Sequence, residues 1–265
     1  MMGILNVTPD SFSDGGRFCN IETACKHALQ MVSEGAAIID VGGESTRPGA
    51  DPVDADIEIS RVVPVIEMVR ATSDVVISID TSKAAVAEAA IAAGADIIND
   101  VTALSGDPRL SAVAVTSGAG VVLMHMKGRP QTMQSMPHYD DVVAEVGEFL
   151  RQKIDAALSS GIDPMCIALD PGIGFGKSHE HNRALIKSTG TLCAIGRPVL
   201  LGVSRKSFLA WAADAPEVGE RLWAGVATTC LGRELGARIF RVHDVRPHRE
   251  AVRMTEAIID GVREQ

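Results

Sequence analysis

Short apolar runs alternate with longer amphipathic segments along the whole chain. The short runs are rich in Val, Ile, Leu and Ala and are continuously apolar, a pattern typical of strands that are buried on both faces. Predicted strands cover residues 3–7, 37–41, 75–79, 95–98, 120–124, 166–169, 199–203 and 239–242.

Between these strands, apolar residues recur at helical spacing, and several of the segments stop at glycine, which commonly ends helices. One predicted helix begins at Asp107 and Pro108, with the aspartate as N-cap and the proline in the first turn. The other predicted helices cover 21–34, about 55–71, 83–93, 140–160, a segment from about 180, a short segment after 203, about 220–235 and 247–262.

The chain therefore repeats a strand-and-helix unit with a period of roughly 30 residues. A closed barrel and an open doubly wound sheet could both hold such units. Eight units in 265 residues favour an α/β fold made of a single (β/α)8 TIM barrel, and no composition shift marks a linker within 1–265. In such a barrel the active site lies at the C-terminal ends of the strands.

Polar side chains stand at the predicted C-terminal ends of these strands. Because those ends meet at one face of a barrel, we expect the side chains to line a single site. They are Asn6, Asp40, Asp80, Asn99, His125, Asp170, Ser204 to Lys206 and Arg241 to His243.

Arg241 and His243 lie two residues apart on a strand and therefore point to the same side. Together with Arg205, Lys206 and Arg47 they could form an anion pocket, since guanidinium groups bind phosphate through paired hydrogen bonds. The alternative is ordinary salt bridging to Asp244 or Glu44, but the agreement of three strand ends favours the anion site.

Asp80, Asn99 and Asp170 each end an inner strand. Two carboxylates and an amide at a barrel mouth could bind a hydrogen-bond-rich edge, such as the 2-amino-4-oxo edge of a pterin or guanine, provided that the buried carboxylates find donors. The alternative role is capping of the following helices, which is credible for Asp80.

Three further segments are candidates for ligand contact. The turn Gly172–Lys177, with Gly174 at its centre, lacks the spacing of a phosphate loop and is predicted to let a flat ligand approach the backbone closely. The segments 8–18 and 42–54 are long enough to be lids or binding loops, although surface insertions remain an alternative.

Three histidines carry weaker signals. His125 could contact a ligand or be a satisfied core histidine. His179 and His181 have the spacing of metal ligands, but they stand at a polar helix start and are interpreted as solvated.

Composition excludes several classes of protein. A net charge of −9 argues against a nucleic-acid surface. Five cysteines without a C-x-x-C pair favour reduced thiols and a cytoplasmic protein. No apolar run is long enough to span a membrane, so no membrane association is expected.

Eight motifs, which follow in order along almost the whole chain, resemble those of the dihydropteroate synthase family of folate biosynthesis. They are GILNVTPDSFSDGG (3–16), DVGGESTRPGA (40–50), SIDTSK (78–83), IINDV (97–101), LMHMKG (123–128), LDPGIGFGK (169–177), GVSRKSF (202–208) and RVHDV (241–245). The resemblance implies a transferase, a sulfonamide target and usually a homodimer. The resemblance further implies that the protein condenses 6-hydroxymethyl-7,8-dihydropterin diphosphate with 4-aminobenzoate to give 7,8-dihydropteroate and pyrophosphate.

The resemblance also implies roles for individual residues. The pterin would be held by Asp80, Asn99, Asp170 and Lys206. The diphosphate would be gripped by Arg241 and His243, joined by Thr46 and Arg47, with Asn6 helping to bind Mg²⁺. The segments that carry Phe12, Asp14, Arg47 and Pro48 would close over aminobenzoate, and Ser207 would lie beside its carboxylate.

Two alternatives to the synthase remain. One is a pterin-binding methyltransferase barrel, which needs no diphosphate grip. The other is a non-catalytic pterin-binding paralogue. Arg241, His243 and the two long segments argue against the former, and the presence of Asn6 and Lys206 argues against the latter.

Overall fold

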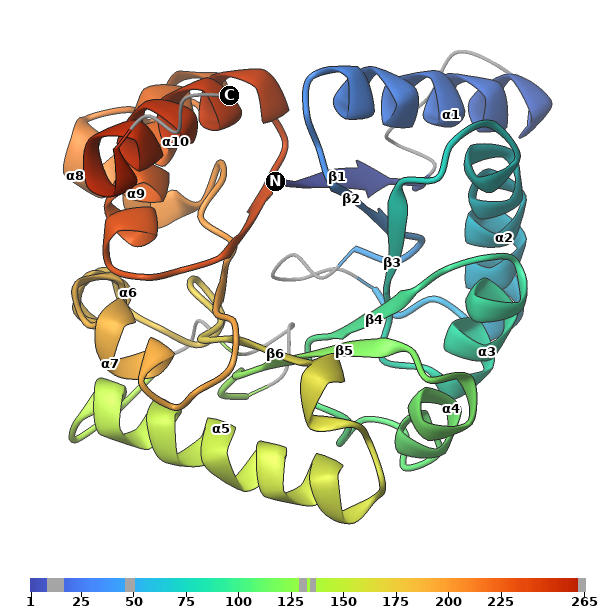
Figure 1. Cartoon of the computed structure of the whole chain (residues 1–265), viewed down its shortest axis with the longest axis horizontal. Coiled ribbons are helices and arrows are strands. Elements are labelled where there is room, and N and C mark those ends of the chain that lie inside the picture. Colours follow the sequence, from blue (N-terminus) through green and yellow to red (C-terminus); the bar gives the residue numbers. More distant parts are fainter. Residues whose placement is uncertain (9–16, 46–50, 129–132, 134–136, 262–265) are drawn as a thin grey trace.

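The computed structural model describes residues 1–8, 17–45, 51–128, 133 and 137–261 and contains eight parallel strands. Figure 1 shows the strands at the centre and the helices in a ring around them. The strands are β1 Met2–Asn6, β2 Ile38–Gly42, β3 Val76–Asp80, β4 Ile97–Asp100, β5 Gly120–Met124, β6 Ile167–Asp170, β7 Leu200–Leu201 and β8 Ile239–Val242.

The described helices follow the strands in the order expected of repeated units. They are α1 Arg17–Ser33, α2 Ala55–Thr72, α3 Ala84–Ala92, α4 Leu110–Ser117, α5 Val142–Ser159, α6 His179–Lys187, α7 Thr189–Cys193, α8 Ser207–Ala213, α9 Leu222–Glu234 and α10 Val245–Asp260, with short 3-10 turns at Pro164–Cys166 and Val218–Arg221.

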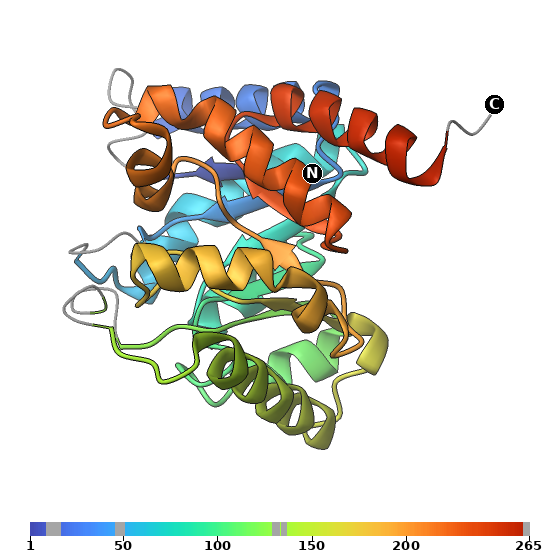
Figure 2. The same ribbon diagram turned by 90° about the vertical axis from the view of Figure 1, so that its left-hand side faces the viewer.

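The sheet closes into a barrel, as the sequence predicts. The strand order is β6-β5-β4-β3-β2-β1-β8-β7, and β1 pairs in parallel with both β2 and β8. A parallel bridge between Leu169 and Val199 joins β6 to the start of β7 and completes the circle. At the β1–β8 seam, Gly35 after α1 lies against Arg249 of α10, and both views show these helices on the same side of the barrel (Figures 1 and 2).

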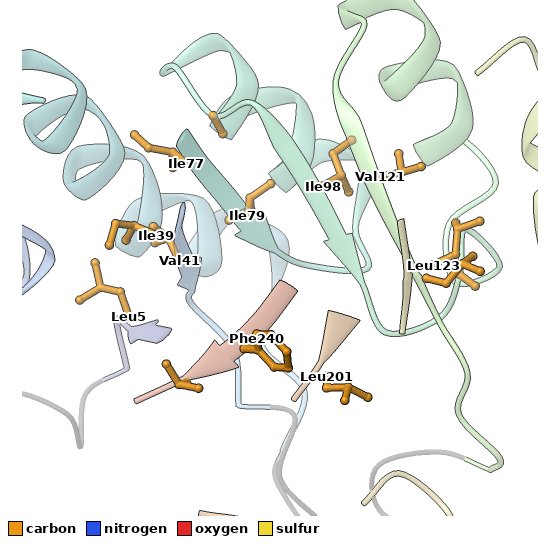
Figure 3. Packing of buried hydrophobic residues seen from close by; sticks show 14 of the residues in the cluster. Leu5, Ile39, Val41, Ile77, Ile79, Ile98, Val121, Leu123, Leu201 and Phe240 are labelled. Atoms are coloured by element: carbon orange, nitrogen blue, oxygen red, sulfur yellow. The ribbon is translucent and has the colours of Figure 1, made fainter. Parts of the chain in front are cut away.

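The two faces of the strands bury different kinds of side chain. Outward residues are Ile, Val, Leu and Phe, and they pack with the helices in one continuous core (Figure 3). Inward residues at the N-terminal end of the barrel form a second small cluster around Met2, Val122 and Leu200. Farther along the strands the inward positions are polar, as Asp40, Ser78 and Asn99 show, each at most 5% exposed. The apolar interior therefore fills only one end of the barrel, and polar side chains line the other end.

Some predicted elements differ from the structure. The strand predicted at 199–203 is reduced to Leu200–Leu201, because Gly202 to Lys206 turn away to begin the connection to α8. The helix predicted to begin at Asp107 begins at Leu110. The Asp107 carboxylate instead accepts hydrogen bonds from the backbone N–H groups of Ala84 and Arg109, both at 3.1 Å.

Within the part of the chain that the structure describes, none of the helices combines the length and the apolar character needed to cross a bilayer.

Candidate active site

One row of side chains crosses the C-terminal mouth of the barrel at the same height. Asn6 pairs in register with Gly42, Gly42 with Asp80, and Asp80 with Asn99. Because these residues occupy the last positions of parallel strands, their side chains share the mouth. Asp80 is 8% exposed and Asn99 is 5% exposed. The structure thus brings together three of the residues predicted to bind substrate.

Arg241 crosses the mouth from β8 and pairs with two carboxylates. Its Nε donates to Asp40 Oδ2 at 2.6 Å, and its Nη2 donates to Asp80 Oδ2 at 2.5 Å. Asn99 Nδ2 donates to the same oxygen of Asp40 at 3.2 Å. Arg241 therefore pairs with neither Asp244 nor Glu44, the salt-bridge partners that the sequence suggested. It joins a buried network whose members come from β2, β3, β4 and β8.

Burial and charge act against each other in this network. Burial raises the pKa of the Asp80 carboxyl to about 7, while the Arg241 guanidinium opposes the rise. Burial also tends to lower the pKa of Arg241, but Asp40 and Asp80 outweigh it and hold that pKa above its usual value. Arg241 is consequently a fixed cation, and its charge favours the ionised form of Asp80 against the effect of burial.

Asp170 and Lys206 form the opposite side of the site. Asp170 is 6% exposed, and its Oδ1 accepts a hydrogen bond from the backbone N–H of Gly172 at 2.7 Å. Lys206 Nζ donates to the carbonyl of Ile173 and lies 4.6 Å from the centre of the Phe175 ring. Burial lowers the pKa of Lys206 to about 8, and the Asp170 carboxylate acts in the opposite direction.

Glycine in the turn 172–177 is required by packing within the protein. Gly172 and Gly174 have φ of +67° and +84°, conformations that favour glycine. A Cβ on Gly172 would lie 1.9 Å from the carbonyl oxygen of His125, and one on Gly174 would lie 3.0 Å from Cδ of Lys206. The observed close approaches are thus to His125, which follows β5, and to Lys206, whereas the approach to a flat ligand stays a prediction.

The predicted anion pocket is only partly assembled from the expected residues. His243 lies beside Ser204, whose Oγ is 3.1 Å from His243 Nδ1 and also accepts from the backbone N–H of His243 at 3.2 Å. Arg205 instead pairs with Asp244, with Nη2 and Oδ1 2.8 Å apart, in a partly exposed salt bridge. Ser207 is exposed at the first position of α8. Arg205 therefore belongs to the rim of the barrel rather than to the mouth.

The loop residues predicted to cover the substrates cannot be placed. Phe12, Asp14, Thr46, Arg47 and Pro48 lie outside the described residues, and their roles stay predictions.

The ion cluster at the base of the second long segment was not predicted from the sequence. Lys83 Nζ donates to Glu44, near the start of this segment, and to Glu58 Oε2 of α2 at 2.5 Å. Glu58 is fully buried and its Oε1 has no partner among the described residues, so Lys83 supplies its main compensation. The cluster fixes the start of this segment against α2 and α3.

The sequence predicted that Asp40 lines the site but gave it no specific role, and it left Lys177 and the role of His125 unassigned. Asp40 stands two residues before Gly42 on the inward face, which is the signal that alternation could have given. His125 is 6% exposed and 2.9 Å from Lys177 Nζ, which favours the core interpretation. His179 is exposed and stacks on Trp211, while His181 caps α6 together with Ser178, in agreement with a solvated helix start.

A divalent metal fits this site only as a partner of the substrate. The described residues contain no group of three or more His, Cys, Asp or Glu side chains arranged to hold a metal ion. Asn6 offers one amide oxygen, about 4.0 Å from the position that a Cβ on Gly42 would take. Mg²⁺ commonly binds through one or two protein oxygens and the phosphates of a substrate, so a lone oxygen beside an anion pocket is compatible with it.

Comparison with known proteins gives consistent matches over almost the whole chain. The family model described as pterin-binding enzyme matches residues 2–243. A dihydropteroate synthase from Synechocystis sp. is 45% identical over 258 residues, which cover 97% of this chain and 89% of the relative. The structure of Xanthomonas albilineans dihydropteroate synthase with 4-aminobenzoic acid has a TM-score of 0.92 and 45% identity, and covers 97% of this chain and 92% of the other. The same enzyme in complex with 7,8-dihydropteroate has a TM-score of 0.88 and 41% identity, with coverage of 97% and 92%.

Proposed function

Because this chain belongs to the dihydropteroate synthase family of pterin-binding enzymes, which are transferases, we propose that it makes 7,8-dihydropteroate. Its substrates are 6-hydroxymethyl-7,8-dihydropterin diphosphate and 4-aminobenzoate, and pyrophosphate is the second product. Relatives of known structure bind 4-aminobenzoic acid and 7,8-dihydropteroate, which supports this choice. The observation that carries the proposal is the polar mouth, in which the carboxylates of Asp40, Asp80 and Asp170, the amides of Asn6 and Asn99 and the cations Arg241 and Lys206 converge.

The heterocycle is bound by Asp80, Asn99, Asp170 and Lys206. A pterin presents N–H donors and a carbonyl acceptor along one edge, and buried carboxylates and an amide complement such an edge. The two carboxylates lie on β3 and β6, so they can contact a flat ligand from different sides of the barrel. Lys206 adds a donor within reach of the same region, since its Nζ already contacts the turn that follows Asp170.

The diphosphate is bound by Arg241 and His243. Two donor groups of Arg241 are held by Asp40 and Asp80, which fixes the plane of the guanidinium. Its remaining amino group, Nη1, has no partner among the described residues and can donate to a phosphate oxygen. His243 follows directly after the end of β8, beside Ser204, and its imidazole supplies a second donor to the diphosphate.

The reaction follows a dissociative path. Cleavage of the C–O bond at the pterin methylene leaves positive charge on the carbon and the electron-rich ring, and negative charge on the departing pyrophosphate. Asp80 and Asp170 stabilise the cationic pterin, and Arg241 stabilises the leaving group. Asn6 would bind Mg²⁺ together with the diphosphate, and the ion would supply further charge neutralisation there. The amine of 4-aminobenzoate then attacks the carbon.

The cellular compartment and the oligomeric state belong to the same proposal. The protein acts in the cytoplasm, and free thiols support this. They are Cys25, Cys166, Cys193 and Cys230, all unbridged among the described residues. It forms a homodimer, which is supported by exposed apolar side chains on α9 and α10, among them Trp223 at 72% and Ile258 at 72% exposure.

The decisive experiment measures pyrophosphate release and dihydropteroate formation from the pterin diphosphate with Mg²⁺, with and without 4-aminobenzoate. We expect both products to form only with the amine, and Lys206→Ala to lower turnover severely. Lys187→Met is the matched control, since Lys187 is exposed at the end of α6. Turnover that does not require the amine, or pterin binding without any turnover, would contradict the synthase.

A further inference from the structure

Lys177 is a buried lysine to which the proposed reaction assigns no role. It ends the turn that follows β6 and is only 3% exposed. Lysine is rarely buried this deeply, because the ammonium group loses its hydration. A lysine buried next to the site therefore needs contacts that compensate for the lost hydration of its amino group.

The amino group contacts three polar atoms. Lys177 Nζ lies 2.9 Å from Nδ1 of His125, and it donates to the carbonyl of Phe175 at 2.9 Å and to the carbonyl of His125 at 3.3 Å. An ammonium has three N–H donors, one for each of these contacts. A neutral amine has two donors for the two carbonyls, and its lone pair fits His125 only in the tautomer that carries the proton on Nδ1. The charged form of Lys177 makes all three contacts when the proton of His125 is on Nε2.

These contacts fasten the end of β5 to the turn 172–176, and the opposite side of that turn holds two predicted pterin ligands. The backbone N–H of Gly172 donates to Asp170 Oδ1, and the carbonyl of Ile173 accepts from Lys206 Nζ. The Phe175 ring lies beneath the same Lys206 amino group. The turn is therefore a bridge between Lys177 and the substrate-facing side chains.

The charge of Lys177 also acts on Asp170. Burial lowers the pKa of Lys177 to about 7, and the Asp170 carboxylate opposes that change. In return, burial raises the pKa of Asp170, and the charges of Lys206 and Lys177 oppose the rise. The other charged or titratable groups that act on Lys177 are Lys206, Lys127, His125 and His181.

We propose that Lys177 is a positioning residue for the pterin site, which fixes the turn 172–176 and helps to keep Asp170 ionised. The proposal rests on the proposed function and adds that one substrate, the pterin, depends on this lysine. Removal of the ammonium loosens the turn beneath Lys206 and removes one of the cations that hold Asp170 in its charged form. The aminobenzoate subsite has no such dependence.

The test compares Lys177→Met with Lys187→Met, a lysine on the exposed surface of α6. Binding of 6-hydroxymethyl-7,8-dihydropterin is measured by calorimetry between pH 5 and 8.5, and KM for 4-aminobenzoate is measured separately. For Lys177→Met we expect the pterin Kd to rise about tenfold or more, since charge-assisted hydrogen bonds are lost, with KM for aminobenzoate within about twofold. The acid limb of pterin binding moves to higher pH, because the pKa of Asp170 rises. Lys177→Arg, which keeps the charge, restores the acid limb.

Two results would overturn the proposal. One is a Lys177→Met protein with the pterin affinity and acid limb of the wild type. The other is a loss of the same size for both substrates, or failure of both Lys177→Met and Lys177→Gln to fold. Either outcome would make the lysine a requirement of the fold alone. Because pterin binding is measured directly, wild-type protein that binds pterin without turnover would contradict the proposed function, and the comparison of pterin affinities and of their pH dependence would still test the role of Lys177.

Discussion

Arg241 shows how a single side chain can set the charge of the site. It bonds two carboxylates from different strands, so the three groups together carry less charge than Asp40 and Asp80 alone. Since an unpaired buried carboxylate is costly, Arg241 makes the acidic mouth possible. Asp40, whose second oxygen Oδ1 has no partner among the described residues, acts mainly by holding this guanidinium in place.

Replacement of Asp40 by asparagine tests this positioning role. Asp40→Asn keeps the shape but loses the charge that anchors Arg241 Nε. We expect kcat/KM for the pterin diphosphate to fall about 10- to 100-fold, since a hydrogen bond to a charged group contributes about 1.5–3 kcal/mol. KM for 4-aminobenzoate should change little.

Asp140→Asn serves as the control for that kinetic comparison, because the Asp140 side chain is 98% exposed. Wild-type kcat/KM in Asp40→Asn would show that Arg241 is positioned without Asp40.

Much of the site could be predicted from the polar and charged residues at the ends of the predicted strands. Asp80, Asn99, Asp170 and Lys206 follow apolar runs and lie at the barrel mouth as predicted. The choice of partner could not be predicted in the same way. Arg205 and Arg241 were both predicted at strand ends, yet Arg205 lies in the connection after β7 and pairs with Asp244 on the rim, while Arg241 lies in β8 and pairs with Asp80 in the mouth. That difference depends on which face of the backbone each side chain leaves, and sequence spacing does not determine it.

At the scale of elements, hydrophobic periodicity predicts that a helix or strand exists better than it predicts the residues at which that element begins and ends. The strands β5 and β8 have the predicted bounds, because their apolar runs are bordered by glycine or polar residues. Asp107 was expected to cap its own helix, but its carboxylate also accepts from the first residue of α3. Capping partners from a neighbouring unit are invisible to local sequence patterns, since adjacency arises only when the barrel closes.

The packing of α10 on α9 predicts a pH dependence of stability. His248 is 1% exposed, with its Nδ1 2.9 Å from Thr229 Oγ1, and burial lowers its pKa from 6.5 to about 4. The unfolded chain therefore binds the extra proton between about pH 4 and 6.5. The stability that depends on neutral His248 is fully present above about pH 6.5 and is lost as pH falls toward 4, at up to about 1.4 kcal/mol per pH unit.

Urea unfolding from pH 4.5 to 7.5 measures this contribution. We expect His248→Asn, which keeps a hydrogen-bond partner for Thr229, to show a weaker decline in the free energy of unfolding with acidification than the wild type. His27→Asn is the control, because His27 is exposed on α1. Parallel pH profiles for the wild type and His248→Asn would refute the assignment.

At the scale of the whole molecule, barrel closure brings the separate motifs into one site. Exposed apolar side chains remain on the outside of the barrel, on α9 and α10. Trp223 and Leu231 lie eight residues apart on α9, and Met254 and Ile258 lie four apart on α10, so each pair shares one face of its helix. All four are between 47% and 72% exposed. Apolar stripes on two packed neighbouring helices are an arrangement that a second copy of the chain can cover.

Sedimentation velocity tests the dimer. We expect the wild type to sediment with about twice the monomer mass at micromolar concentration, and Trp223→Glu and Ile258→Glu each to shift the equilibrium toward monomer, because a charge would be buried without a partner at the interface. Met165→Glu places the same charge on another exposed apolar residue, 89% exposed and outside α9 and α10, and should leave the mass unchanged. If the wild type is a monomer, or if the dimer persists in both variants, the apolar stripes on α9 and α10 are not a dimer interface. The barrel mouth is built from residues of one chain, so monomeric variants should retain pterin binding, which separates assembly from the chemistry of the site.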